Sequence, residues 1–440
     1  MADVRPFAGV RYNQSLVGDL SAVICPPYDI IPPQLQQELY LKSEYNFIRI
    51  EHGRILPQDG VTDNKYTRSA ATLEQWLRQG ILRVDDAPAI YLHDHYYTHQ
   101  GKEYKRRGIM ACVRLQEWDE MVVRPHEGTL AEPSEDRLSL LWACQVNASP
   151  ILALYEDPGQ RVSSLLAAQE RSKPLINLCG VNGEKHNILA ITEPEVVNQI
   201  CSGLAQQPLY IADGHHRYES SLTYQRERRV CSPSVTGNET FNFVMMTLVD
   251  LADPGLTILA PHRMVRGISK ATLDEFAAKL RLLFDVEELP LDMPGVWQRV
   301  DDLLTCTETE ETSQVRLVLF GLAAERLFML RLRDSTVASQ LMPYFHCELY
   351  KRLDVSIVDH IILEKLLRLS NDKSDVLAYN YDRQGAIDKV LSQEYQLAFL
   401  LSPIKAEVIK AIADMGDRLP RKSTYFYPKP PSGLVFNRLA

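Results

Sequence analysis

The segment YIADGHHRYESSLTYQ (Tyr210–Gln225) decides the expected fold, because it changes from the pattern of a strand to that of a helix within a few residues. Leu209–Ala212 is apolar enough for a central strand, and the Asp213-Gly214 pair ends it. Glycine allows a tight turn and lets the backbone approach a ligand closely. A helix follows from about His216, so the segment predicts a strand, a turn and a helix.

The turn concentrates chargeable side chains. The first N–H groups of a helix have no partner within the helix, and together with the helix dipole they favour a bound anion such as phosphate. His215, His216 and Arg217 would hold that phosphate. Asp213 would hold Mg²⁺, which proteins bind through one or two carboxylates. In the structural alternative, Asp213 only caps the helix and one histidine is a buried polar group. So many polar residues in one turn favour the functional interpretation.

Apolar strands and amphipathic helices alternate on both sides of this turn. We expect a strand at His186–Thr192, a helix at Glu193–Ala205 and a strand at Phe241–Val249. Such alternation predicts a mixed α/β fold. We divide the chain into three regions: residues 1–115 with a proline-rich loop and a hairpin, residues 116–266 as the core that carries the turn, and residues 267–440 as a further α/β region.

Composition and charge narrow the classes of partner. Hydrophobic residues make up 45% of the 440 and charged residues 24%, as in ordinary globular proteins. The net charge of −9 disfavours nucleic acid and anionic membranes, because phosphate binding needs clustered Lys and Arg. The eight cysteines show no Cys-x-x-Cys spacing, which argues against a zinc site. No apolar run approaches a membrane span and no secretory signal is visible, so we expect a cytoplasmic protein.

A second polar loop, VVRPHEGT (Val122–Thr129), offers further site residues. In the functional interpretation Glu127 accepts a proton from an attacking hydroxyl group, while Arg124 or His126 holds phosphate. Thr129 would supply a hydroxyl to the substrate. A solvated loop before a helix explains the same residues equally well.

Two further segments contain candidate binding residues. CPPYD places Tyr28 and Asp29 on a turn made rigid by prolines, which suits either a substrate-binding loop or a structural corner. KSTYFYPK offers Lys422, Ser423, Thr424 and Lys429 as phosphate partners, although no Gly-x-x-x-x-Gly-Lys-Ser/Thr loop is present.

Three histidines, His93, His95 and His99, fall on the predicted hairpin. Their spacing along a strand is one that can hold a transition metal. An exposed hairpin is the simpler interpretation, and we assign no metal there.

The DGHHR sequence at Asp213–Arg217 resembles the nucleotide-binding turn of the ParB/sulfiredoxin superfamily. Free serine kinases of that superfamily carry an Asp-Gly-His-x-Arg type of turn. The resemblance implies a ParB/sulfiredoxin-like core in which Asp213, Gly214, His215, His216 and Arg217 contact nucleotide phosphates. Sulfiredoxins have a cysteine where this chain has His215, so sulfinic-acid repair is not implied.

Nearly the whole chain resembles the bacterial and archaeal family called domain of unknown function 1015. The segments that carry this resemblance include RPFAGVRY, CPPYDII, NFIRIEHG, YIADGHHRYESSLTY and RKSTYFYPKPPSGLV. The gene context of that family is often linked with serine biosynthesis, which fits a phosphotransferase related to phosphoserine.

These observations together predict an enzyme that transfers a phosphoryl group, with ATP or ADP and Mg²⁺, to or from a small hydroxyl metabolite. Serine or phosphoserine is the first choice of substrate, and a homodimer is an expected assembly. Two alternatives stay open: a phosphohydrolase that uses the same pocket, in the manner of a phosphoserine phosphatase, and a non-catalytic nucleotide-binding switch.

Overall fold

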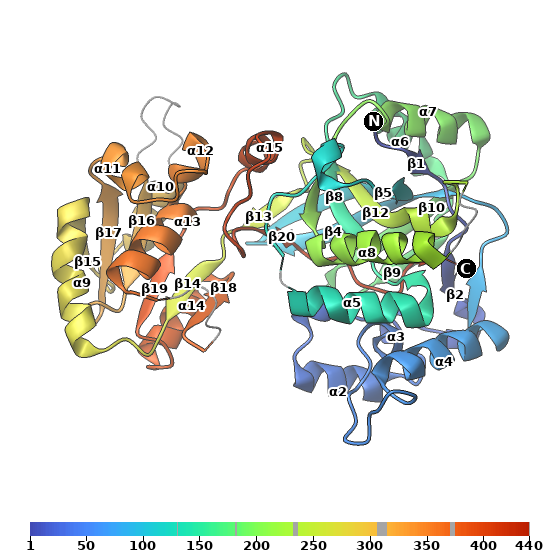
Figure 1. The fold of residues 1–440 in the computed structure, drawn as a ribbon, viewed down its shortest axis with the longest axis horizontal. Coiled ribbons are helices and arrows are strands. Elements are labelled where there is room, and N and C mark those ends of the chain that lie inside the picture. The colour runs from blue at the N-terminus through green and yellow to red at the C-terminus, as the bar shows by residue number, and fades with distance from the viewer. Residues whose placement is uncertain (130, 181–182, 232–235, 306–314, 370–374, 440) are drawn as a thin grey trace. The chain divides into compact units, whose positions relative to one another are not determined.

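The computed structural model describes residues 1–129, 131–180, 183–231, 236–305, 315–369 and 375–439 (Figure 1). Contacts divide the chain into two compact units. The first unit contains residues 1–125, 129–257 and 426–440, and the second contains residues 126–128 and 258–425. The C-terminal segment therefore returns to the first unit.

A nine-stranded mixed sheet forms the centre of the first unit, in the order β6-β11-β8-β12-β5-β4-β10-β9, with β1 beside β5. The pairs β6/β11 and β8/β12 are parallel, and the others are antiparallel. The predicted regions 1–115 and 116–266 both contribute strands to it. The strands are β1 (Val4–Arg5), β4 (Ile90–His99), β5 (Lys102–Arg114), β6 (Val123–Arg124), β8 (Ile151–Tyr155), β9 (Ile176–Cys179), β10 (Lys185–Ile191), β11 (Leu209–Asp213) and β12 (Phe243–Asp250).

Both faces of this sheet are buried, because side chains alternate along a strand and apolar residues occupy both sets of positions. On β5, Ile109 and Ala111 join one hydrophobic cluster, whereas Met110 and Cys112 join another. Helices α6, α7 and α8 contribute to the first cluster, and α2, α3, α4 and α5 contribute to the second (Figure 1). Their bounds are α2 (Pro33–Lys42), α3 (Ile48–Glu51), α4 (Lys65–Arg78), α5 (Ala131–Cys144), α6 (Arg161–Ala168), α7 (Pro194–Leu204) and α8 (His215–Cys231).

Short elements complete the first unit. Strand β2 (Val10–Tyr12) pairs with β3 (Leu82–Val84), and β7 (Val146–Asn147) pairs with β21 (Asn437–Arg438). The hairpin between β4 and β5 turns at Gln100 and Gly101, both with positive φ. This hairpin and the strand, turn and helix around Asp213 agree with the sequence prediction.

The second unit contains a six-stranded antiparallel sheet in the order β15-β17-β16-β19-β14-β18. Its strands are β14 (His262–Val265), β15 (Phe284–Pro290), β16 (Arg316–Phe320), β17 (Arg326–Leu332), β18 (Leu377–Asn380) and β19 (Leu397–Leu400). Its longer helices are α9 (Lys270–Leu283), α10 (Val296–Thr305), a π-helix (Ile357–Leu366), α14 (Arg383–Leu391) and α15 (Ala406–Asp414).

Sheets and helices in both units confirm the predicted mixed α/β fold. Among the helices that the structure describes, none is both long and apolar enough to cross a membrane.

Candidate functional site

The turn between β11 and α8 is built around Gly214. Its φ of +98° lies in the region that disfavours other residues, and α8 begins directly after it at His215. A Cβ at this position would lie 2.9 Å from Arg217 Nε. Glycine therefore lets the chain turn tightly and leaves room for the Arg217 side chain.

Asp213 lies at the end of β11 between two cations. Lys429 Nζ donates to Asp213 Oδ1 at 2.7 Å, and Arg217 Nη2 donates to Asp213 Oδ2 at 2.6 Å. Lys429 also forms an ion pair with Asp29, and Arg217 Nη1 donates to the Pro150 carbonyl. The cluster of Asp29, Asp213, Arg217 and Lys429 thus balances two negative charges with two positive ones.

The pKa values in this cluster follow from its ion pairs. Burial would raise the pKa of Asp213, but the charges of Lys429 and Arg217 hold it well below its usual range. Burial would lower the pKa of Lys429, but Asp213 and Asp29 raise it. Both groups therefore stay ionised at neutral pH.

A second charged cluster surrounds Arg137 on α5. The guanidinium donates to the Glu51 backbone carbonyl at 3.0 Å and to the Asp136 carboxylate, and it lies 4.0 Å from the Tyr28 ring centroid. Ser149 Oγ donates to Glu51 Oε1 at 2.6 Å. Arg137 is only 6% exposed and Glu51 only 1%, so both side chains are held inside the protein.

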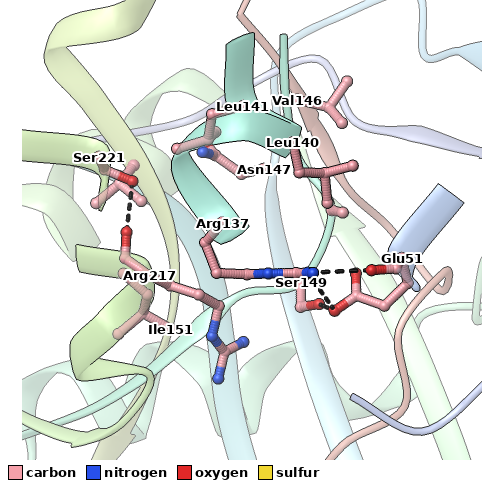
Figure 2. Close-up of a pocket in the computed structure, with 12 residues that line it drawn as sticks. Glu51, Arg137, Leu140, Leu141, Val146, Asn147, Ser149, Ile151, Arg217 and Ser221 are labelled. Atoms are coloured by element: carbon pink, nitrogen blue, oxygen red, sulfur yellow. Dashed lines mark hydrogen bonds and ion pairs between the residues drawn. The ribbon is translucent and has the colours of Figure 1, made fainter. Parts of the chain in front are cut away.

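One pocket connects these two clusters (Figure 2). Arg217, Glu51, Arg137 and Ser149 all line it, together with Ser221 and apolar side chains of α5 and the sheet. Among the described residues, buried Arg217 Nε and buried Glu51 Oε2 have no hydrogen-bond partner. An unpaired buried polar atom is costly, and both of these atoms belong to residues that line the pocket, so a ligand that reached them would supply the missing acceptor and donor.

Several residues that the sequence proposes for the site lie in the first unit, near the start of α8 or in loops. His215 is buried, and His216 Nδ1 lies 3.2 Å from Ser134 Oγ. The Arg124 Nε group donates to the Met121 carbonyl at 2.8 Å. Thr129 lies in the loop before α5.

Tyr28 and Asp29 begin a short 3₁₀ helix after the prolines of the CPPYD segment. Burial raises the pKa of Tyr28 to about 12, so its hydroxyl stays protonated at neutral pH. Asp29 reaches Lys429, a residue 400 positions away along the chain. The structure thus brings Asp29 to the same cluster as Asp213 and Arg217.

His126, Glu127 and Lys422 belong to the second unit. Glu127 accepts hydrogen bonds from the backbone N–H groups of Lys422, Ser423 and Thr424, and from the Thr424 hydroxyl. Its carboxylate therefore anchors the 422–424 loop. His126 Nε2 lies 2.9 Å from the same Thr424 hydroxyl. The role of Glu127 as a general base stays a prediction.

Sequence reasoning assigned no role in this pocket to Glu51, Arg137 or Ser149, and it left Lys429 as a general phosphate partner. One available signal was a glutamate next to the apolar residues Phe47, Ile48 and Ile50, in NFIRIEHG. Asp136 and Arg137 are neighbours near the start of α5, where the sequence favours a local pair at the surface. The pair exists, but Arg137 is buried.

The structure defines a mixed α/β protein with a buried, charge-paired candidate pocket. The chain belongs to the family described as protein of unknown function (DUF1015), which matches residues 4–356. No curated protein matches it.

Solved structures share a weak likeness with the chain. A free serine kinase in complex with AMP is 12% identical, with a TM-score of 0.35, over 72% of this chain and 86% of the kinase. A conserved hypothetical protein from Pyrococcus furiosus is 13% identical, with a TM-score of 0.35, over 76% of this chain and 95% of that protein. C-terminally truncated SbnI from Staphylococcus aureus is 12% identical, with a TM-score of 0.33, over 73% of this chain and 85% of SbnI.

Proposed function

We propose that the protein binds a nucleotide with its phosphate end at this pocket and transfers a phosphoryl group to or from the hydroxyl of a small metabolite. The observation that carries this proposal is that two residues lining one pocket, Arg217 and Glu51, each have a buried polar atom without a partner, Nε and Oε2 respectively. A phosphate oxygen would accept from Arg217, and a hydroxyl group would donate to Glu51. Serine or phosphoserine is the first substrate to test, because the DGHHR turn resembles that of free serine kinases.

Each group has a defined task in this proposal. Arg217 and the first N–H groups of α8 hold the phosphate, and Lys429 keeps Asp213 ionised and in place. In the kinase direction, the substrate oxygen attacks phosphorus and its proton passes to Glu51 Oε2. The bond between that phosphorus and the bridging oxygen of the nucleotide breaks, and the departing nucleotide keeps the electron pair on this oxygen. Glu51 is a stronger candidate for the base than Glu127, whose carboxylate already accepts four hydrogen bonds.

The Asp213 carboxylate does not fit the predicted role of a resident Mg²⁺ ligand. Asp29 and Asp213 converge on one point, and the Lys429 ammonium group lies there. Arg217 takes the other Asp213 oxygen. We therefore propose that any Mg²⁺ arrives with the nucleotide, and no step here depends on it.

Phosphorus-31 NMR tests the reaction directly. The protein is mixed with Mg²⁺, phosphoserine and ADP, and separately with serine and either ATP or ADP. Nucleotide-coupled change in phosphoserine would support a serine phosphotransferase. Free phosphate released without a nucleotide would favour the phosphohydrolase, and nucleotide binding without turnover would favour the switch protein. If the protein neither binds a nucleotide nor turns over any of these substrates, the proposal is contradicted. A cytoplasmic location and a homodimer stay predictions.

A further inference from the structure

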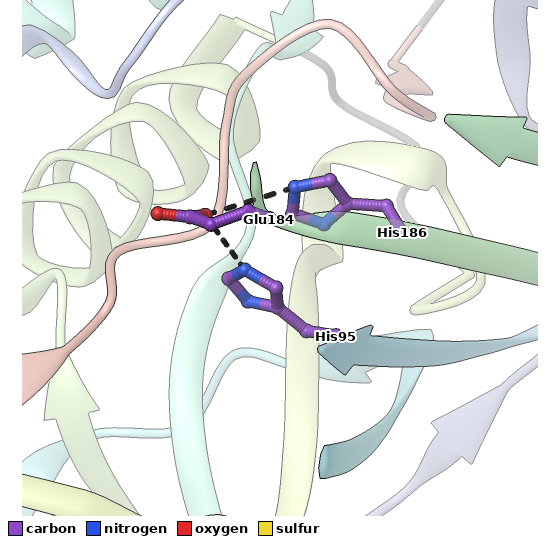
Figure 3. Close-up of side chains that lie close together, drawn as sticks. All are labelled: His95, Glu184 and His186. Atoms are coloured by element: carbon purple, nitrogen blue, oxygen red, sulfur yellow. Dashed lines mark hydrogen bonds and ion pairs between the residues drawn. The ribbon is translucent and has the colours of Figure 1, made fainter. Parts of the chain in front are cut away.

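A buried cluster of histidines lies on β4 and β10 of the first unit (Figure 3). His93 and His95 are buried, so the interpretation of this segment as an exposed hairpin is wrong at these two positions. His95 Nε2 lies 2.8 Å from Glu184 Oε2, and His186 Nε2 lies 3.9 Å from the same oxygen. His93 Nε2 lies 3.0 Å from His186 Nδ1. Two histidines and one carboxylate form a common ligand set for transition metals, so the cluster has the composition of a metal site.

The hydrogen bonds of His95 argue against a metal. Arg106 Nη2 lies 3.1 Å from His95 Nδ1, and a guanidinium group can only donate. His95 Nδ1 must therefore be the acceptor, which leaves the imidazole proton on Nε2, where it is donated to Glu184. A metal ligand needs a lone pair on that nitrogen. Arg106 is also a buried positive charge beside the site, which further disfavours a cation.

The same arginine reaches the segment that carries Lys429. Arg106 Nη2 donates to the Pro428 carbonyl at 2.8 Å, and Nη1 donates to the Tyr427 carbonyl at 3.3 Å. These are the two residues immediately before Lys429, and all of them belong to the first unit. Arg106 is 4% exposed, so few other groups could satisfy these carbonyls if it were removed.

We infer that Glu184, His95 and Arg106 form a positioning chain that holds Lys429 against Asp29 and Asp213. Glu184 fixes the tautomer of His95, His95 orients the Arg106 guanidinium, and Arg106 holds the backbone that presents Lys429. These residues are positioning residues, since none of them lines the pocket. The importance of this chain for activity rests on the function proposed above, but its effect on Lys429 does not.

The ionisation of the cluster agrees with this geometry. Burial, followed by the charge of Arg106, lowers the pKa of His95 to about 2. The pKa of His186 is lowered to about 3, mainly by burial. His95 and Arg106 lower it further, whereas the Glu184 carboxylate opposes this effect. Both imidazoles are therefore neutral at physiological pH, as the required tautomer demands.

Competitive labelling of lysines with acetic anhydride, read by mass spectrometry, tests the inference without any ligand. In the wild-type protein, Lys429 is 7% exposed and ion-paired, so it should react far more slowly than exposed Lys102. Arg106→Gln should raise the labelling of Lys429 about tenfold, the effect of about one pKa unit. Arg107→Gln is the matched control, because the neighbouring Arg107 pairs with Asp94 and Glu170 instead.

A second variant tests the inference even if Arg106→Gln does not fold. Glu184→Ala removes the partner of the His95 N–H from a side chain that is 21% exposed, and it should also raise the labelling of Lys429. Unchanged Lys429 labelling in either folded variant would overturn the inference. Stoichiometric Co²⁺ binding that disappears in His95→Gln would also overturn it, because the metal needs the tautomer that Arg106 excludes.

A double-mutant cycle on ADP affinity connects the chain to the pocket. If Arg106 acts through Lys429, Arg106→Gln should weaken ADP binding in the wild-type background and have no further effect beside Lys429→Met. Full additivity of the two changes would contradict the inference. If the wild-type protein does not bind ADP at all, the proposed function fails, whereas the labelling result still decides the positioning chain.

Discussion

At the scale of single residues, the pocket depends on two atoms that the folded chain leaves unsatisfied. Glu51 Oε2 and Arg217 Nε are buried and have no hydrogen-bond partner among the described residues. Neighbouring groups hold the remainder of each side chain in place, through Ser149 for Glu51 and through Asp213 for Arg217. A bound ligand would therefore meet groups that are already oriented, which reduces the entropy lost on binding.

Glu51→Gln tests the role of that carboxylate as a proton acceptor. Glutamine keeps the shape of the side chain but cannot take the proton, so turnover should fall by about 10²–10⁴-fold while ADP affinity changes little. Steady-state rates and ADP titration measure the two effects separately. The control is Glu74→Gln, on an exposed glutamate that pairs with Arg438. Turnover equal to that of the wild type would remove Glu51 from the mechanism.

At the scale of elements, the β11–α8 turn requires glycine at its centre. Gly214→Ala would place a residue with a Cβ at φ +98° and push that Cβ against the Arg217 side chain. The free energy of unfolding should fall by about 1–3 kcal/mol, and ADP affinity should fall with it. Urea unfolding measures the first effect. Gly60→Ala is the control, since a Cβ there meets no neighbouring atom, and an equal loss in both variants would contradict the account.

Elements whose signals are local could be predicted from the sequence. The apolar run before Asp213, the glycine break and the polar helix after it lie within one short segment, and the structure confirms them. The hairpin around Gln100 and Gly101 could also be predicted from the sequence, because turn residues separate two apolar strands. The burial of Arg137 could not be predicted, because the sequence around it is typical of an exposed helix start.

At the scale of the whole molecule, the candidate site is assembled from distant parts of the chain. Lys429 lies 216 positions from Asp213 and 400 positions from Asp29, yet it contacts both. Glu51 and Ser149, which share a hydrogen bond, are 98 positions apart. Periodicity and local motifs contain no information on such pairings, so the sequence predicted the turn but not the residues that complete the pocket around it.

The buried histidines should make the stability of the first unit depend on pH. Their folded pKa values, about 2 for His95 and about 3 for His186, lie below the unfolded value near 6.5. The unfolded chain therefore binds more protons over this range, so stability is complete above pH 6.5 and falls as the pH decreases. In His186→Asn the slope between about pH 4 and 5.5 should become shallower by about 1.4 kcal/mol per pH unit, as measured by urea unfolding. Identical slopes would show that His186 is not held neutral in the folded protein.

The most direct test of the central claim is calorimetric titration of ADP into the wild-type protein and into Arg217→Gln. ADP should bind the wild-type protein saturably, with one site per chain. The affinity should be weaker by about tenfold or more in the variant, because a hydrogen bond from a charged donor to phosphate is lost. Equal affinities in two folded proteins, or no binding to the wild type, would contradict the assignment of this pocket.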